Sequence, residues 1–229
     1  MVEFLFLDMD DTILDFQKAE QVAIQKTLAE AGIQPTEAVC KRYSQINDGY
    51  WKKLERGEVT QAQLRVMRFA DLIEELGVEA DAQGCAESYM ENLGIGHYFM
   101  DGAEEAVKSL SQKYKLYLAS NGQAKTQQSR LDSAGIEKYF DGVFISGKIG
   151  VNKPSPQYFA HCFDRIPGFD LKKAMIVGDS LTSDILGGKN AGITTCWVNP
   201  THKIAPAELK PDYEIEGIAQ LERLLETLS

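Results

Sequence analysis

The sequence predicts an α/β protein in which a parallel sheet carries an inserted block of helices. Two observations lead to this prediction. From residue 98 onward, short apolar runs alternate with helix-length segments, and one further apolar run stands apart at residues 2–7. Between these two parts, residues 16–97 contain helical patterns with no strand pattern among them. Repeated strand–helix units imply parallel strands that are covered by helices.

The first apolar run, Val2–Leu7, is short and almost uniformly hydrophobic, which is typical of a strand buried on both faces. The segment after it has the character of helix throughout, with Thr60 as a candidate N-cap and glycines at the expected helix ends. Four helices in succession indicate a bundle-like subdomain. They are expected at residues 17–31, 36–56, 60–76 and 81–93.

The rest of the chain supplies the other strands and their connecting helices. Strands are expected at residues 115–119, 142–145, 174–177 and 194–198, and helices at residues 102–112, 123–134, 156–165, 181–191 and 217–228. Because the run at residues 2–7 has the same apolar character, we expect it in the same sheet. The predicted organisation is an α/β domain of residues 1–15 and 98–229, with a helical domain of residues 16–97 inserted after the first strand.

Bulk properties exclude several classes of function. A length of 229 residues suits one large domain or a domain with an insert. The formal net charge of −10 argues against a surface for nucleic acid polymers or for anionic membranes. We find neither a signal peptide nor an apolar run near the roughly 20 residues that span a bilayer. The four cysteines are scattered and are expected to be buried thiols of a cytoplasmic protein.

Four polar clusters each follow a predicted strand. They are Asp8-Met9-Asp10-Asp11-Thr12, Ser120-Asn121-Gly122, Lys153-Pro154, and Gly178-Asp179-Ser180 with Asp184 beyond it. The carboxyl ends of parallel strands meet at one edge of a sheet, where ligands bind. We therefore expect the four clusters to converge on one pocket. Carboxylates crowded at the end of a buried strand raise each other's pKa or require a cation, which favours a bound divalent metal.

With these motifs in this order, the chain resembles the haloacid dehalogenase (HAD) superfamily of phosphohydrolases. The resemblance implies a Rossmann-like parallel sheet as the core and an α-helical cap as the insert. Within the superfamily the chain is similar to the pyrimidine 5'-nucleotidase branch. The similar stretches are residues 8–15, residues 57–60, and residues 184–188 leading to Cys196-Trp197.

The resemblance assigns the chemistry to the acidic motif. It makes Asp8 the nucleophile, which forms an aspartyl-phosphate that water hydrolyses. Asp10 is the general acid/base, which protonates the leaving alkoxide and then deprotonates the attacking water. Because dehalogenases of the superfamily lack this second carboxylate, Asp10 favours phosphoryl transfer. A Mg²⁺ ion is implied as cofactor, held by Asp8, Asp179 and the backbone carbonyl of Asp10.

The other motifs are implied to bind the phosphate. Ser120 donates to a phosphate oxygen, and the amides of Asn121 and Gly122 point into the same space if a helix begins there. Lys153 supplies a compact positive charge to the phosphate and the nucleophile. Asp184 orients Lys153 or a metal-bound water. Thr12 is expected to hydrogen-bond within its loop, and Asp11 to have a loop or solvent role.

Three functions remain open at this stage. The first is a Mg²⁺-dependent 5'-nucleotidase acting on pyrimidine nucleoside monophosphates. The second is a phosphatase with the same chemistry that acts on phosphoglycolate or a sugar phosphate, and a sugar-phosphate mutase is also possible. The third is a non-catalytic scaffold that binds a partner through the cap. Specificity would reside in cap side chains, although aromatic residues at helical spacing also suit a cap core. The candidates are Tyr50, Trp51, Arg65, Arg68 and Phe69.

Overall fold

The computed structural model describes residues 1–228 and confirms the predicted α/β class. Six strands form one sheet in the order β3-β2-β1-β4-β5-β6, and every neighbouring pair is parallel. The first strand, β1, lies in the middle of the sheet. There Leu7 is paired with Leu118 on one side and with Val177 on the other. The strands are β1 (Phe4–Leu7), β2 (Lys115–Ser120), β3 (Gly142–Ile145), β4 (Ala174–Gly178), β5 (Thr194–Val198) and β6 (Tyr213–Ile215).

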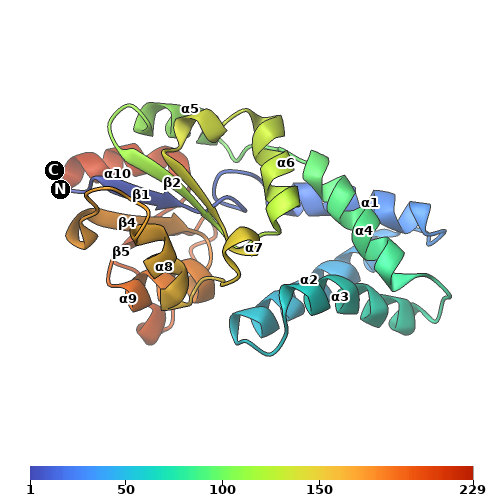
Figure 1. The fold of residues 1–229 in the computed structure, drawn as a ribbon. Helices are drawn as coiled ribbons and strands as arrows, with labels where there is room; N and C mark the ends of the chain where they lie inside the picture. Colours follow the sequence, from blue (N-terminus) through green and yellow to red (C-terminus); the bar gives the residue numbers. More distant parts are fainter. Residues whose placement is uncertain (229) are drawn as a thin grey trace.

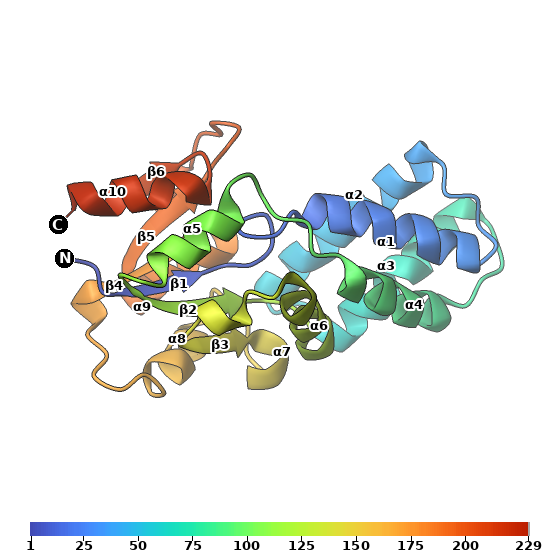
Figure 2. The same cartoon turned by 90° about the horizontal axis from the view of Figure 1, so that it is seen from above.

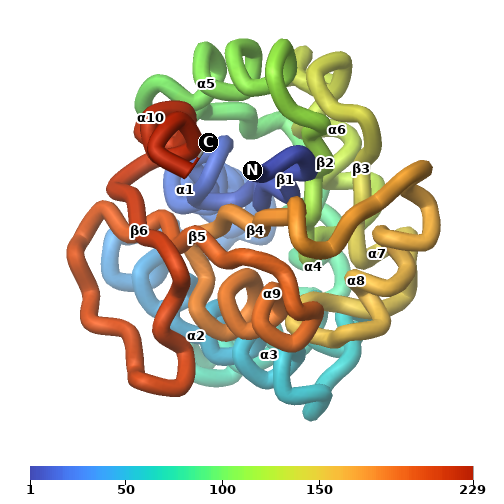
Figure 3. Tube along the Cα trace, turned by 90° about the vertical axis from the view of Figure 1, so that its left-hand side faces the viewer, coloured from blue at the N-terminus to red at the C-terminus, as the bar shows by residue number. Residues whose placement is uncertain are grey.

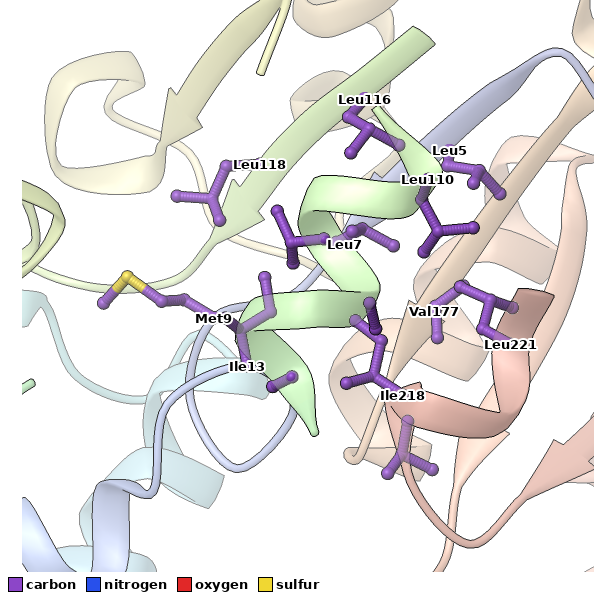
Figure 4. Packing of buried hydrophobic residues seen from close by; sticks show 14 of the residues in the cluster. Leu5, Leu7, Met9, Ile13, Leu110, Leu116, Leu118, Val177, Ile218 and Leu221 are labelled. Carbon is purple, nitrogen blue, oxygen red and sulfur yellow. The ribbon is translucent and has the colours of Figure 1, made fainter. Parts of the chain in front are cut away.

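Helices cover both faces of the sheet (Figure 1). The helices α5 (Ala103–Leu110) and α10 (Leu221–Thr227) lie on one face, and α8 (Pro156–Phe163) and α9 (Leu186–Ala191) lie on the other. Successive side chains of a strand point to opposite faces, and β1 follows this rule. Its leucines pack around α5, as Figure 4 shows, while its phenylalanines face α8. Each such buried side chain contributes about 1.5–3 kcal/mol, so the centre of the sheet is a firm support for the loop after β1.

Four helices form a separate layer beyond the carboxyl edge of the sheet (Figures 1 and 2). We call them the helical block; they are α1 (Phe16–Glu30), α2 (Glu37–Glu55), α3 (Gln61–Leu76) and α4 (Ala82–Ile95). Each begins at an N-cap whose side chain accepts a backbone N–H, as Thr60 does from Gln63. The block has its own hydrophobic cluster, centred on the rings of Tyr43, Phe69 and Tyr89.

Two connections join the helical block to the sheet, and they lie side by side. The backbone N–H of Asp15 donates to the carbonyl oxygen of Tyr98 at 2.8 Å, and that of Met100 donates to Ile13 at 2.9 Å. After β2, the helix α6 (Ala124–Ala134) leaves the sheet and packs against α4. Both termini lie at the opposite end of the sheet, where they face the viewer in Figure 3. The carboxyl edge of the sheet therefore faces the helical block.

The structure also differs from the prediction in places. The short strand β6 and the one-turn helix α7 (Ser146–Ile149) were not predicted. The helix expected at residues 181–191 is divided into a π-helical turn, Leu181–Ile185, and α9. The last helix is preceded by a 3₁₀ turn at Ile218–Gln220. All four cysteines are free and buried, as predicted. Within residues 1–228, no helix has both the length and the apolar character that a membrane crossing requires.

Candidate active site

A cavity of about 1150 Å³ is lined by residues after the carboxyl ends of the strands and by residues of the helical block. All four predicted clusters contribute to its sheet side. These residues are Asp8, Asp10, Asp11, Asn121, Lys153, Asp179, Ser180, Ser183 and Asp184. The predicted phosphate ligand Ser120 is fully buried behind this wall. The helical block supplies the opposite wall, which includes Glu20, Asn47, Trp51 and Glu55.

The ammonium group of Lys153 lies between two carboxylates. Its Nζ atom donates to Oδ1 of Asp8 at 2.7 Å and to Oδ1 of Asp184 at 2.6 Å, and a third bond reaches the carbonyl oxygen of Ala119. All three charged side chains are almost fully buried. Burial alone would lower the pKa of Lys153, but Asp184 and Asp8 raise it above its ordinary value, so the lysine is charged. Lys153 is thus a fixed cation against Asp8.

Asp8 is the residue on which the electrostatics of the site converge. Burial raises its pKa to about 8, and the charges of Asp184 and Asp10 act in the same direction, while Lys153 opposes them. Its backbone N–H donates to the carbonyl oxygen of Val177 at 2.9 Å, which extends the β1–β4 ladder by one residue. The sheet therefore fixes the carboxylate at the floor of the cavity.

Carboxylate oxygens of Asp8, Asp179 and Asp184 all lie within 4.8 Å of one another. Lys153 balances one of the three charges, so two negative charges are left uncompensated when all three are ionised. Burial raises the pKa of Asp179 well above its ordinary value, as do Asp8 and Asp184. A divalent cation removes this repulsion, and Mg²⁺ prefers oxygen ligands of this kind. The donor set therefore fits the metal that the sequence implied.

The loop after β4 is built to hold these carboxylates. The side chain of Asp184 accepts a hydrogen bond from the backbone N–H of Ser180 at 3.1 Å. This bond holds the π-helical turn at Leu181–Ile185 close to the end of β4. At Gly178 a Cβ atom would collide with the carboxylate of Asp184, so only glycine allows this approach. The indole Nε1 of Trp197 donates to the carbonyl oxygen of Asp179 at 2.7 Å and fixes that residue from β5.

Asn121 fixes the loop that carries Lys153. Its amide accepts the backbone N–H of Lys153 and donates to the carbonyl oxygen of the same residue, both at 2.8 Å. It also donates to Ser183 Oγ at 3.1 Å. The side chain of Asn121 therefore connects three of the four clusters, and all of its hydrogen bonds hold the loops in place. The prediction for Asn121 concerned its backbone amide and not this side chain.

Asp10 lies apart from the three clustered carboxylates. Its Oδ1 atom is paired with Arg130 Nη1, and its Oδ2 atom accepts from Gln127 Nε2 at 2.7 Å. Sequence reasoning missed both partners. They stand three residues apart on α6, in a run of mainly polar residues that is typical of a solvated helix face, yet both are buried.

Two loop residues near Asp8 have structural positions. The carboxylate of Asp11 accepts the backbone N–H of Phe16 at 2.9 Å and so contributes to the start of α1. Asp11 has a φ of 53°, a left-handed conformation that Asp adopts more readily than most residues. Thr12 was expected to hydrogen-bond within the loop, but its buried Oγ1 has no partner among residues 1–228. The expectation of a hydrogen bond within the loop was therefore wrong: the hydroxyl is buried without a partner among the described residues.

The specificity candidates are placed differently. Trp51 lines the large cavity, and it also lines a pocket of about 40 Å³ beside it, together with Asp10, Arg65 and Arg68. Arg68 is buried and donates to Asn47 Oδ1 at 2.7 Å, with its guanidinium 4.5 Å from the centre of the Tyr89 ring. Tyr50 and Phe69 are buried among the helices of the block, and neither lines these two spaces.

The sequence matches the family model of haloacid dehalogenase-like hydrolases over residues 2–192. The chain belongs to this family. The match spans β1 through α9 and so includes all four polar clusters. The family match confirms the resemblance that the motifs indicated. Similar proteins named as phosphatases and nucleotidases support phosphatase activity for this hydrolase.

The hydrolase is similar to several proteins over nearly its whole length. It is 39% identical to YfnB of Bacillus subtilis strain 168, covering 96% of this chain and 94% of YfnB. The pyrimidine 5'-nucleotidase PynA of Streptococcus pneumoniae is 37% identical, with 96% and 93% covered. The pyrimidine 5'-nucleotidase YjjG of Escherichia coli K12 is 29% identical, with 97% of both covered.

A crystal structure of YfnB with bound magnesium, which is described as revealing interdomain movement, is also similar. It matches the hydrolase with a TM-score of 0.94 at 39% identity, covering 98% of each chain. The agreement extends over the sheet and the helical block together. A relative with this architecture thus holds magnesium, and the buried acidic triad here is suited to the same ion.

Proposed function

We propose that the hydrolase is a Mg²⁺-dependent phosphatase that forms an aspartyl-phosphate on Asp8, and that its substrates are pyrimidine nucleoside 5'-monophosphates. The observation that carries this proposal is the contact of Lys153 with Asp8, beside Asp179 and Asp184, at the floor of a large cavity. In this proposal residues 1–15 and 98–229 are the core domain, and residues 16–97 are the cap domain.

The reaction would proceed in two transfers. The carboxylate of Asp8 attacks phosphorus, a new oxygen–phosphorus bond forms, and the ester bond to the leaving group breaks while Asp10 gives that oxygen a proton. A water molecule then attacks the same phosphorus, Asp10 takes its proton, and the bond to Asp8 breaks to release inorganic phosphate. Lys153 opposes the repulsion between Asp8 and the phosphate dianion throughout.

The cofactor would be held by Asp8, Asp179 and the backbone carbonyl of Asp10, with Asp184 orienting Lys153. When bound, Mg²⁺ supplies charge neutralisation between the carboxylates and the phosphate and orients the transferred group. The hydroxyl of Ser120 and the backbone amide of Asn121 would donate to the phosphate oxygens, while the backbone N–H of Gly122 donates to Ser120 Oγ at 3.2 Å.

The helical block contacts the core through a direct hydrogen-bonded connection. The amide of Gln61, at the start of α3, donates to Ser146 Oγ at 2.9 Å and to Asn152 Oδ1 at 3.0 Å. A cap in this position would exclude water from the reacting groups and hold the leaving group. Cavities of 300–1,000 Å³ bury most of a drug-sized ligand, so the roughly 1150 Å³ here leaves room for a nucleoside.

Two observations favour a nucleoside over phosphoglycolate as the leaving group. The wall opposite Asp8 carries the carboxyl groups of Glu20 and Glu55, which in their ionised form would repel a substrate carboxylate. Lys153 is the one buried cation lining this cavity in the described part of the chain, because Lys18 and Lys41 are exposed. The similar proteins PynA and YjjG are pyrimidine nucleotidases.

The proposal is tested by measuring phosphate release from a substrate panel with and without Mg²⁺. The panel contains dUMP, dTMP, UMP, AMP, phosphoglycolate and ribose 5-phosphate. We expect release that requires Mg²⁺ and is fastest with a pyrimidine nucleotide. Faster release from phosphoglycolate would overturn the substrate assignment. No release from any compound would overturn the phosphatase and favour a binding scaffold.

A further inference from the structure

Two side chains of α6 hold both oxygens of the carboxylate proposed as the general acid/base. Arg130 contacts one oxygen of Asp10, and Gln127 contacts the other. We propose that Arg130 and Gln127 are positioning residues, which aim Asp10 at the leaving-group oxygen and the Ser120 hydroxyl at the phosphate. This inference rests on the proposed phosphatase function and adds two residues to its machinery.

Arg130 is held in place from several directions. Its side chain is fully buried, and its Nε donates to the carbonyl oxygen of Gly96 at 2.9 Å. Its guanidinium carbon lies 6.0 Å from the centre of the Phe16 ring. Gly96 lies just after α4 and Phe16 begins α1, so both belong to the junctions between the helical block and the sheet. Arg130 therefore presents a fixed cation to Asp10.

Gln127 connects Arg130 to both Asp10 and Ser120. Its Oε1 accepts from Arg130 Nη1 at 3.3 Å, which sets the orientation of the amide. The opposite end, Nε2, donates to Asp10 Oδ2 at 2.7 Å and to Ser120 Oγ at 2.8 Å. One buried amide thus joins the carboxylate and the hydroxyl that the proposed reaction requires.

The hydrogen bonds of Ser120 explain what this arrangement achieves. Its Oγ accepts from Gln127 Nε2 and, at 3.2 Å, from the backbone N–H of Gly122. A hydroxyl has one hydrogen and two acceptor lone pairs. Because two N–H groups occupy the acceptor positions, the hydrogen of Ser120 is left to donate, which is the role required toward a phosphate oxygen.

The packing around Gln127 is specific to this arrangement. A Cβ atom at Gly122 would collide with the side chain of Gln127, so the glycine leaves the space that the amide occupies. On the far side, the Nη2 atom of Arg130 is buried and has no partner among residues 1–228. An unsatisfied buried donor is unfavourable for stability. Its presence beside Asp10 is more readily explained by a role in placing that carboxylate than by stability alone.

The test separates positioning of a proton donor from a general structural role. An alkyl phosphate such as a nucleotide has a strongly basic leaving oxygen and needs a proton, whereas p-nitrophenyl phosphate has a weakly basic one and needs little help. We would measure kcat/KM, which reports the first phosphoryl transfer, for the best alkyl phosphate of the panel and for p-nitrophenyl phosphate. The variants are Arg130→Met, Arg130→Lys and Gln127→Met, with Gln128→Met as the matched control on the same helix.

General acid catalysis contributes about 10²–10⁴ in rate, so partial misplacement of Asp10 should be visible. We expect Arg130→Met and Gln127→Met to lower kcat/KM for the alkyl phosphate at least ~10-fold more than for p-nitrophenyl phosphate. Arg130→Lys should recover part of the difference, and Gln128→Met should leave the ratio unchanged. The ratio is measured on one preparation, so the fraction of folded enzyme cancels.

Equal losses on both substrates, or no loss on either, would overturn the positioning role. If Arg130→Met does not fold, Gln127→Met tests the same network without removing a buried charge. A wild-type protein inactive on every phosphate ester would instead refute the proposed function. A wild type that is active while the ratio does not change in the variants refutes this inference alone.

Discussion

Lys153 Nζ lies 2.7 Å from Asp8 Oδ1, although the two residues are 145 positions apart in the sequence. Asp8 directly follows the last residue of β1, and Lys153 lies in the loop after α7. Both side chains are nearly inaccessible to solvent. A buried ion pair of this kind is weak support for stability but strong support for a site, because two desolvated charges are costly to bring together.

Replacing Lys153 with methionine should damage both activity and stability. The variant keeps the length of the side chain but leaves Asp8 and Asp184 without their shared cation. We expect kcat to fall by about 10²–10³, as for loss of one charge-stabilising donor. Without Mg²⁺, the free energy of unfolding should fall by about 3–5 kcal/mol, the usual effect of breaking a buried pair. Initial rates and urea unfolding measure the two effects.

Lys173→Met is the matched control, because that lysine pairs with Glu3 at 3.2 Å on the surface. Exposed pairs contribute about 0–1 kcal/mol, so this variant should be close to wild type in both measurements. A Lys153→Met protein with normal rates would show that the buried cation has no part in the reaction.

Magnesium should stabilise the protein more as the pH rises. Burial raises the pKa of Asp8 to about 8 in the folded protein, whereas the unfolded value is about 4. Between these values the folded protein binds more protons than the unfolded chain, so its stability without metal falls with rising pH. Mg²⁺ binds the ionised carboxylates and relieves this loss. Thermal midpoints from about pH 5 to about pH 8, with and without Mg²⁺, measure the effect.

Asp179→Asn is the control for this titration, because it removes one of the three clustered carboxylates. The stabilisation by Mg²⁺ should shrink in this variant at every pH. A stabilisation that is constant with pH, or largest in acid, would place the ion somewhere other than this cluster.

Glu55→Gln should weaken discrimination against acidic substrates. The carboxyl group of Glu55 lines the same cavity as Asp8, Lys153 and Asp184, so it faces the reacting groups. Removing one charge at this range changes the interaction with a substrate carboxylate by about 1–2 kcal/mol. We expect kcat/KM for phosphoglycolate to rise roughly 5- to 30-fold relative to dTMP. Glu58→Gln, at the exposed ion pair with Arg56, should leave this ratio unchanged.

Trp51→Ala should weaken binding of substrates that carry a base. Trp51 is the one aromatic residue of α2 that lines both the large cavity and the small pocket beside Asp10. Stacking of a base on an aromatic side chain contributes about 1–3 kcal/mol. We expect KM for dTMP to rise at least ~5-fold with little change for ribose 5-phosphate, and Trp51→Phe to retain most of the binding. An equal effect on both substrates would exclude stacking on this ring.

Much of this architecture could be predicted because its signals are local. The apolar runs at β1, β2, β4 and β5 predicted four strands, which the structure places at the centre of the sheet, and the position of each polar cluster after a strand predicted that the clusters meet at one edge. The strand β6 was missed because three residues carry too little pattern. The division of residues 181–191 into two helical forms depends on the contact between Asp184 and Ser180, which no periodicity encodes.

The parts of the site that could not be predicted depend on tertiary contacts. Gln127 and Arg130 have the sequence signature of a solvated face, yet tertiary contacts of α6 with α4 and with the loops after β1 and β2 bury them. Arg68 was a candidate for substrate contact, but three aromatic rings surround its guanidinium. The side chain of Asn121 holds the loop that carries Lys153. The sequence around Asn121 and around Lys153 contains no pattern that predicts this contact.

The most direct test is to trap the phosphoryl group on the enzyme. The protein would be mixed with ³²P-labelled substrate and Mg²⁺ and quenched in acid within the first turnover. One half would be digested in acid and mapped for ³²P, and the other half would be reduced with borohydride, which releases the phosphate, before its peptides are sequenced. The account predicts label on the peptide that contains Asp8, homoserine at position 8 after reduction, and neither signal in a folded Asp8→Asn variant. Phosphate release at normal rates with label on no peptide, or with label on a different residue, would contradict it.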